Sequence, residues 1–170
     1  DGPAVLEGVT AGLKTGEVLG IQGNNGSGKS TLLQLFMGAV RPQRGQLLIN
    51  GEAIEPGDIA KWQREIVYLG QRPVLFDGSV MDNITMFGGE EMVDEAIEIA
   101  QTLGLDRVFA AYPDGFDTRI GARAVSSLPG GIGQRVTIAR ALLRRPSLIL
   151  FDEANTALDS QGDALVRDAL

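Results

Sequence analysis

The sequence lacks two residue types that many metal sites and active sites use. Among its 170 residues there is no cysteine and no histidine. Without cysteine the chain can form neither disulfide bonds nor thiolate metal sites, and without histidine it has no imidazole ligand and no imidazole base. No apolar run approaches the roughly 20 residues that span a bilayer. A disulfide framework, a cysteine or histidine metal centre and a membrane-spanning helix are therefore not expected within these residues.

Positive charge is also scarce. Lys and Arg number 15 against 22 Asp and Glu, which gives a net charge of −7. A protein that follows a nucleic-acid backbone needs clustered Lys and Arg, so we expect no nucleic-acid partner. The length and the 44% hydrophobic content suit one compact domain with a hydrophobic core. The start, Asp1-Gly2-Pro3, is typical of neither a signal peptide nor a native initiator, and we expect a soluble domain cut from something larger.

Strand-like and helix-like segments alternate along the chain. Apolar runs predict strands at 18–21, 46–50, 66–69 and 148–151, with Asn50-Gly51 as a tight hairpin turn. Apolar spacing predicts helices over 80–85, 90–103, 106–112 and 132–144, a helix from Lys29 that Gly38 closes, and a last helix from about Ser160. This alternation indicates an α/β fold whose middle third is a helical insert.

A glycine-rich segment follows the first predicted strand. It matches the phosphate-loop pattern with Gly23, Asn24, Asn25, Gly26, Ser27, Gly28, Lys29 and Ser30, and Thr31 comes next. Glycines let successive backbone N–H groups point at phosphate oxygens, and the following helix adds its positive end. Lys29 can then reach the β- and γ-phosphates of a nucleotide, and the Ser30 hydroxyl can ligate Mg²⁺. The alternative is a glycine-rich turn with an exposed lysine, but the flanking strand and helix favour the phosphate site.

Two acids end the apolar run 148–151. Asp152 is placed to hold the Mg²⁺ shell, and Glu153 is placed to polarise an attacking water as a general base. Two surface acids that merely terminate a strand are the alternative. The phosphate loop earlier in the chain favours the catalytic interpretation.

Taken in order, these motifs resemble an ATP-binding cassette (ABC) domain, and the resemblance covers nearly the whole chain. It rests on the phosphate loop, Gln71, the segment from Leu128 to Arg135, Asp152-Glu153, and Ala157-Leu158-Asp159. It implies a P-loop NTPase fold with a mostly parallel sheet, an N-terminal antiparallel β portion and a helical subdomain. The implied division is a core over 1–73 and 145–170 and a helical subdomain over about 74–144, within one partial domain over 1–170.

The resemblance also implies roles for residues that the phosphate loop alone does not explain. Gln71 resembles the Q-loop glutamine, which contacts Mg²⁺ or water and takes part in catalysis. The segment from Pro73 to Ile84 resembles the exporter branch of the family, which implies that Phe76 faces a coupling helix of a membrane domain; a packed core phenylalanine is the alternative. Ala157-Leu158-Asp159 resembles the D-loop between the two sites of a dimer, or else Asp159 or Ser160 simply caps a helix.

The chain departs from the family pattern at three places. The signature segment reads Leu128-Pro129-Gly130-Gly131-Ile132, where the family has Leu-Ser-Gly-Gly-Gln. Gly130 and Gly131 keep the close backbone approach to a partner's nucleotide. The serine hydroxyl that would reach that nucleotide is missing, which implies weakened or asymmetric activation between subunits. The family's switch histidine and its adenine-stacking aromatic residue are absent as well, and we expect a chain truncated at both ends.

The resemblance implies an ATP-binding and ATP-hydrolysing domain that powers export across a membrane, with ATP and Mg²⁺ as cofactors. Its implied partners are a second nucleotide-binding domain, arranged head to tail in a homodimer or heterodimer, and a transmembrane domain. The implied location is the cytoplasmic side of the plasma membrane, peripheral or fused to the membrane domain. A soluble ABC ATPase that is not coupled to transport and a nucleotide-binding fragment without hydrolysis remain as alternatives.

Overall fold

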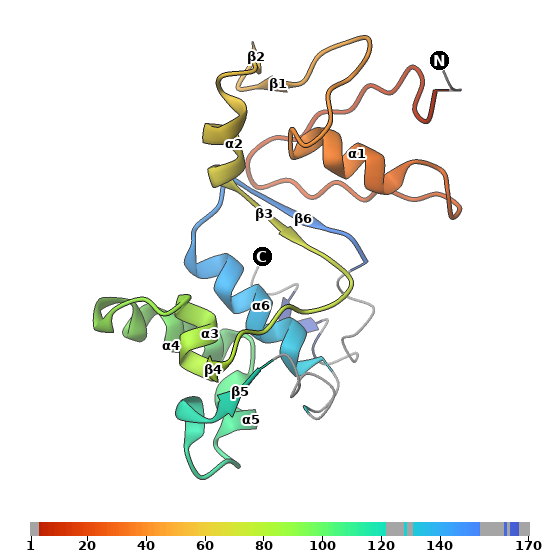
Figure 1. Cartoon of the computed structure of the whole chain (residues 1–170). Helices are drawn as coiled ribbons and strands as arrows, with labels where there is room; N and C mark the ends of the chain where they lie inside the picture. The colour runs from red at the N-terminus through yellow and green to blue at the C-terminus, as the bar shows by residue number, and fades with distance from the viewer. Residues whose placement is uncertain (1–3, 122–127, 129–130, 154–161, 163, 167–170) are drawn as a thin grey trace. The chain divides into compact units, whose positions relative to one another are not determined.

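The computed structural model describes residues 4–121, 128, 131–153, 162 and 164–166. The chain divides into two compact units, Asp1–Tyr68 and Leu69–Leu170, and each is described by itself. Figure 1 shows the helices and strands with the labels that are used below.

The first unit contains two helices and a hairpin, which are α1 (Lys29–Phe36), β1 (Leu48–Ile49), β2 (Glu52–Ala53) and α2 (Ile59–Glu65). Helix α2 packs against the end of α1. The indole Nε1 of Trp62 donates a hydrogen bond of 2.7 Å to the carbonyl of Phe36, which is one of the carbonyls that a helix end leaves unpaired. Gly38 (φ 67°) ends α1, and a Cβ there would lie 3.3 Å from the Cγ2 of Ile59. The predicted start at Lys29 and stop at Gly38 are therefore confirmed.

The predicted hairpin turn is present. Strands β1 and β2 pair antiparallel with Leu48 opposite Ala53 and Ile49 opposite Glu52. Asn50 and Gly51 connect them with φ values of 53° and 85°. Both residues lie in the left-handed region, as a two-residue hairpin turn of this kind requires.

One predicted strand is not found. The structure assigns no strand to residues 18–21, although Val18-Leu19-Gly20-Ile21 is apolar. The side chains of Val18 and Leu19 are 92% and 42% exposed. An apolar run becomes a strand only when a neighbouring backbone pairs with it, and no strand within residues 4–28 supplies that partner.

The second unit is mainly helical around one central helix. Its elements are β4 (Gly78–Ser79), α3 (Val80–Thr85), η1 (Glu90–Met92), α4 (Val93–Thr102), α5 (Leu105–Phe109), η2 (Gly115–Asp117), β5 (Arg119–Ile120), α6 (Ile132–Leu143) and β6 (Leu148–Phe151). Helix α6 packs against α3, α4 and α5 (Figure 1). Its sequence explains its central place, because nine of its residues are buried and its apolar side chains lie all round the helix.

The core of the second unit contains its largest fully buried side chains. They include Phe109, Ile84, Leu103, Leu105, Ile132, Ile138, Val80 and Val136. Burying each such side chain contributes about 1.5–3 kcal/mol relative to leaving it in water. The predicted helices over 80–85 and 132–144 are confirmed. The one predicted over 90–103 is divided into η1 and α4, and the one over 106–112 is a shorter α5 that starts after Gly104 (φ 65°).

Strand β3 (Ile66–Leu69) ends at Leu69, the first residue of the second unit, where its carboxyl end approaches that of β6. The backbone N–H of Asp152 donates to the carbonyl of Leu69 at 2.9 Å. The carboxyl ends of these two strands therefore meet. Both strands were predicted at these positions, and Gly162 and residues 164–166 are helical as predicted, while the rest of the last predicted helix lies outside the described residues.

Helix α3 begins with a capping box. The Ser79 hydroxyl accepts from the backbone N–H of Asp82 at 2.9 Å, and the Asp82 carboxylate accepts from the backbone N–H of Ser79 at 2.8 Å. The backbone N–H of Ser79, then its side chain, and to a smaller extent the charge of Arg119 stabilise the Asp82 carboxylate and lower its pKa, while burial opposes the shift. The two partners satisfy each other's unpaired donors, which fixes where α3 starts.

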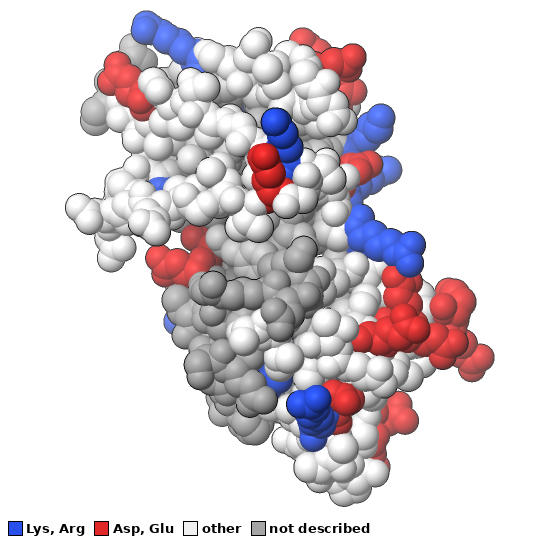
Figure 2. All heavy atoms as spheres, turned by 180° about the vertical axis from the view of Figure 1, so that it is seen from behind, with Lys and Arg blue, Asp and Glu red and all other residues white. Residues whose placement is uncertain are grey.

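Charged side chains of both signs are spread over the surface. On the face drawn in Figure 2, Lys and Arg alternate with groups of Asp and Glu, and the described residues form no continuous basic area there. Surface charge on that face therefore marks no site, and the candidate site follows from the loops instead.

Candidate nucleotide-binding site

The phosphate loop of the first unit has a backbone that its glycines make possible. Gly26 and Gly28 have φ values of 80° and 91°, a region that L residues with a side chain rarely adopt. A Cβ at Gly23 would lie 2.5 Å from the Oγ of Ser27, and a Cβ at Gly28 would lie 2.7 Å from the Cδ2 of Leu6. The spacing of these glycines is therefore required by the fold of the loop.

Lys29 is the first residue of α1, and its side chain lies along the loop. Its Nζ donates to the carbonyls of Gly23 and Asn24 at 2.8 and 3.0 Å. The ammonium group is thus held against the loop by neutral carbonyls. A phosphate oxygen is a stronger acceptor for this group, because hydrogen bonds between charged partners are about twice as strong as neutral ones.

The remaining predicted phosphate contacts belong to the same loop and helix. Asn24, Asn25, Gly26, Ser27 and Ser30 are exposed, and Thr31 is half-buried. The backbone N–H of Ser27 donates to the carbonyl of Asn24 at 3.1 Å, which closes the turn. The backbone amides of the loop and of the first turn of α1 therefore form the positive end of a helix, and the Lys29 side chain lies beside it.

The second unit brings two predicted site residues together. Gln71 lies two residues after β3, and Glu153 lies two residues after β6. The Gln71 Nε2 donates to the Glu153 Oε2 at 2.8 Å. Glu153 has a φ of 53°, an uncommon value for a residue with a side chain, which is the kind of backbone that clusters at functional sites.

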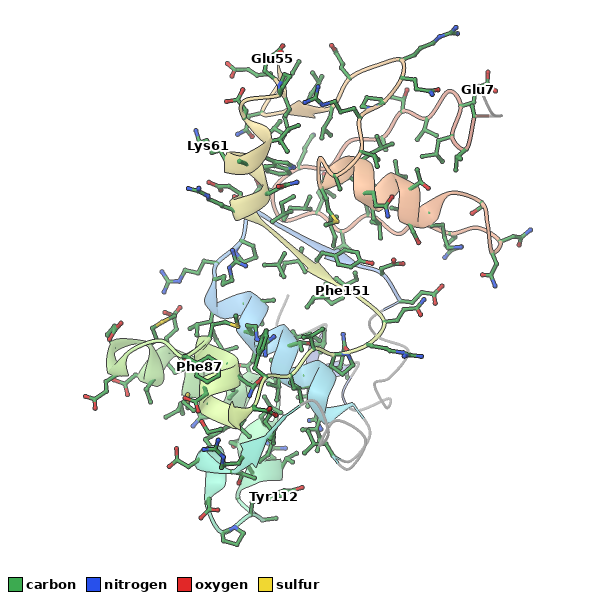
Figure 3. All side chains as sticks on the ribbon, viewed as in Figure 1. Glu7, Glu55, Lys61, Phe87, Tyr112 and Phe151 are labelled. Carbon is green, nitrogen blue, oxygen red and sulfur yellow. The ribbon has the colours of Figure 1, made fainter. Side chains whose placement is uncertain are left out.

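Asp152 occupies the position between β6 and Glu153. It is half-buried, and its backbone is held by the bond to Leu69. Phe151, the last residue of β6, is labelled in Figure 3. The end of β6 thus fixes the backbone of Asp152. The carboxylate of Glu153 is exposed and is held by the Gln71 amide. This pairing can orient Glu153 as a base, and the end of β6 places Asp152 where a metal ligand is expected.

Only part of the signature segment is described. Gly131 (φ 78°) is the N-cap of α6, and Ile132 is 2% exposed. The apolar residue in place of the usual glutamine is therefore a core residue. Pro129, Gly130 and the segment Ala157-Leu158-Asp159 lie outside the described residues.

Two interacting residues escaped the sequence analysis. Arg140 of α6 and Asn83 of α3 join residues 74–76 to both helices through side-chain hydrogen bonds. Phe76 is 39% exposed and lies under the Arg140 guanidinium, 5.0 Å from its centre, so it is no packed core phenylalanine. The available signal was one cation within the stretch 136–143, whose other residues are apolar except Thr137, together with a polar residue, Asn83, on the helix that packs against it.

Within the described residues, no helix has the length and apolar character needed to cross a membrane, and no cluster of three or more Asp or Glu side chains is arranged to hold a metal ion.

A phosphate loop at the start of a helix, with acids at the end of an apolar strand, defines the class of P-loop nucleotide-binding domains. The sequence pattern of the ABC transporter family matches residues 6–156. The chain belongs to this family. The fold class predicted from the sequence, an α/β P-loop domain of the ABC ATPase type, is thereby confirmed.

The chain is similar to several membrane transporters. It is 38% identical to the ABC-type transporter fsqE of Aspergillus fumigatus over 160 residues, which are 93% of this chain and 12% of that protein. It is 36% identical to the alpha-hemolysin translocation ATP-binding protein HlyB of Escherichia coli O157:H7 over 166 residues, 98% of this chain and 23% of that protein.

Among solved structures, it resembles a bacterial Atm1-family ABC exporter with ATP bound. The TM-score is 0.76 at 32% identity, and the match covers 86% of this chain and 25% of the exporter chain. The chain therefore spans a quarter or less of the length of each of these relatives. The family membership supports nucleotide binding by this chain.

Proposed function

We propose that this chain is the ATP-binding and ATP-hydrolysing domain of an exporter. The observation that carries the proposal is the phosphate loop with the Lys29 ammonium group held against it by the carbonyls of Gly23 and Asn24. The likeness to exporters, including a structure with ATP bound, supports it.

In this proposal each motif has a distinct role. The amides and side chains of residues 23–31 bind the phosphates, with Lys29 as the cation that exchanges its carbonyl partners for phosphate oxygens. Glu153 acts as general base toward the attacking water, and Gln71 orients Glu153 through the bond of 2.8 Å between them. Gly130 and Gly131 contact the nucleotide of a partner domain.

Mg²⁺ belongs to the proposal because the candidate ligands suit it. Ser30, Gln71 and Asp152 all offer oxygen donors, and Mg²⁺ prefers oxygen ligands while keeping several waters. The half-buried Asp152, whose backbone the end of β6 holds in place, is the observation in the structure that fits this role. Bound Mg²⁺ supplies charge neutralisation at the phosphates.

The proposed assembly follows the transporters that resemble the chain. It comprises a second nucleotide-binding domain, head to tail, and a transmembrane domain, with this chain at the cytoplasmic side of the plasma membrane. We further propose a core over 1–73 and 145–170 and a helical subdomain over about 74–144. The exposed Val74 and Phe76 are the candidate contacts with the membrane domain.

A second candidate is a nucleotide-binding domain without turnover. The observation that favours it is the signature segment, where Pro129 replaces the usual serine and Ile132 is buried in the core. In that case the chain binds nucleotide and regulates a catalytically active partner.

The first experiment is a titration of the chain with a fluorescent ATP analogue, with and without Mg²⁺. Lys29→Ala is the test variant, and Lys61→Ala, an exposed lysine on α2 (Figure 3), is the matched control. Binding that Lys29→Ala loses and Lys61→Ala retains supports the phosphate site. Equal binding by both variants contradicts it, and phosphate release by the wild type separates the hydrolysing domain from the one without turnover.

A further inference from the structure

The side chain of Asn83 is a buried junction in the second unit. It lies on α3 with 0% exposure. Its Oδ1 accepts from the backbone N–H of Phe76 at 2.8 Å, and its Nδ2 donates to the carbonyls of Phe76 and Ser79, each at 2.9 Å. The amide thus pairs with both backbone groups of Phe76 as a neighbouring strand would, and it fixes that residue against α3.

Arg140 completes the junction from α6. Its Nε donates to the carbonyl of Asn83 at 2.6 Å, its Nη2 donates to the Asn83 Oδ1 at 3.0 Å, and its Nη1 donates to the carbonyl of Val74 at 2.9 Å. The guanidinium also lies over the Phe76 ring. One side chain therefore ties α6 to α3 and to residues 74–76.

These partners of Arg140 are neutral. In the described part of the chain its hydrogen bonds go to carbonyl and amide oxygens, and burial lowers the pKa of the guanidinium because the charged form loses water. Placing a cation where it is partly desolvated and meets no carboxylate among the described side chains is costly. An apolar side chain of similar length would avoid that cost. The arginine at this position therefore indicates that its hydrogen bonds to residues 74 and 83 are needed.

Helix α6 touches the same segment a second time, about two turns earlier. A Cβ at Gly133 would lie 3.1 Å from the Cγ of Pro73 and 3.7 Å from the Cδ1 of Leu75. Residues 73–76 therefore lie against α6 at two places, through close packing at Gly133 and through the hydrogen bond from Arg140 to Val74. This segment begins two residues after Gln71, whose amide holds Glu153, and α6 begins at Ile132 of the signature segment, directly after its N-cap Gly131.

We propose that Arg140 is a positioning residue for ATP hydrolysis: by fixing residues 74–76 to α6, it keeps Gln71 and Glu153 in register with the helix that starts at the signature. The inference rests on the proposed function. A movement of Gln71 is then passed to α6 as a rigid displacement, and a movement of α6 is passed back to the Gln71–Glu153 pair.

The test compares Arg140→Lys and Arg140→Met in the full-length protein that carries this chain. Lysine keeps the charge but loses the planar set of donors that reaches three acceptors at once. The matched controls are Arg145→Lys and Arg145→Met, because the Arg145 side chain is 79% exposed and pairs with Glu95 rather than with residues 74–76. The measurements are the Kd of a fluorescent ATP analogue, kcat and KM of phosphate release, the Tm, and hydrogen exchange of residues 74–79.

We expect Arg140→Lys to bind nucleotide within about twofold of the wild type, while kcat falls about 10- to 100-fold, since misplacement by about 1 Å can cost this much. Hydrogen exchange of residues 74–79 should accelerate in this variant and not in Arg145→Lys. Arg140→Met should be at least as impaired. If Arg140→Met does not fold, Arg140→Lys decides the question.

A kcat of Arg140→Lys equal to that of Arg145→Lys overturns the positioning role. A fall in kcat that comes with a comparable loss of nucleotide affinity and a lower Tm also overturns it, because a purely structural residue would affect all three. An Arg140→Lys protein that fails to fold overturns it as well. A wild-type protein that binds no nucleotide overturns the proposed function itself, and this role with it.

Discussion

Gly28 shows how one residue limits what the phosphate loop can accept. It combines a φ of 91°, at which a residue with a side chain is strained, with a close approach to Leu6, whose side chain would have to shift to admit a Cβ. The loop and the packing of the preceding segment therefore depend on the same position.

Gly28→Ala is expected to destabilise the first unit by about 1–3 kcal/mol, because a residue with a Cβ is strained in this region of φ. The variant should also lose affinity for nucleotide. Thermal unfolding and analogue titration measure the two effects. Gly57→Ala is the control, since a Cβ at Gly57 would meet nothing within 4 Å and its φ is not positive. Equal stability of the two variants would contradict the role of Gly28.

Glu153 is the residue proposed as general base, and a single substitution tests this role. Glu153→Gln keeps the size of the side chain and removes the carboxylate that accepts from Gln71. If Glu153 is the general base, kcat should fall by about 10²- to 10⁴-fold while nucleotide affinity is retained. Steady-state phosphate release and the analogue titration give the two values. Turnover at the wild-type rate would remove Glu153 from the mechanism.

At the scale of elements, α3 depends on its capping box. Ser79→Ala removes the acceptor for the Asp82 N–H and should lower the free energy of unfolding by about 1 kcal/mol. Chemical denaturation measures the loss. The matched control is Thr102→Ala at the last residue of α4, where the hydroxyl only returns a hydrogen bond to the helix carbonyl of Glu98.

The capping box also predicts a dependence of stability on pH. The pKa of Asp82 is lowered in the folded state, so its contribution is present above the unfolded pKa of about 3.8 and is lost as the pH falls through the lower folded value. Below neutral pH the difference in stability between wild type and Asp82→Asn should stay constant and then shrink under about pH 4. Denaturation curves from pH 7 to 3 check this, with Glu98→Gln, an exposed acid of α4, as the control.

The sequence predicted the elements well where local signals decide them. Gly38 marks a helix end, Asn50-Gly51 marks the hairpin, and the apolar run 148–151 marks β6. It failed at 18–21, because pairing with a distant backbone decides whether an apolar run is a strand. It missed the junction of Asn83 and Arg140 for the same reason: the bonds of Arg140 reach 57 and 66 residues back along the chain.

At the scale of the whole molecule, the two units differ in how much they bury. The fully buried large side chains of the described residues all belong to the second unit, whereas in the first unit Leu33 and Ile66 are the buried apolar residues. Local stability follows buried apolar contacts, so the units should open with different free energies.

Native-state hydrogen exchange should therefore be slower in α4 and α6 than in α1. Nucleotide at about 100 times its Kd should then protect α1 by up to about 2.7 kcal/mol, since it binds the closed loop and not the opened one. Lys29→Ala should cancel this protection without changing the exchange of α6. If nucleotide slowed hydrogen exchange equally in α1 and α6, the two units would unfold together as one cooperative unit.

The exposed apolar residues of segment 4–21 have a consequence for how copies of the chain behave in solution. Val5, Val9 and Val18 are 62%, 51% and 92% exposed on a backbone that forms no strand. Such surfaces favour association, while the net charge of −7 keeps copies apart. Salt shortens the range of that repulsion from about 10 Å at 0.1 M to about 3 Å at 1 M and leaves the apolar attraction in place. Light scattering by the chain should therefore rise as salt is added, so that the chain is most nearly monodisperse in dilute buffer.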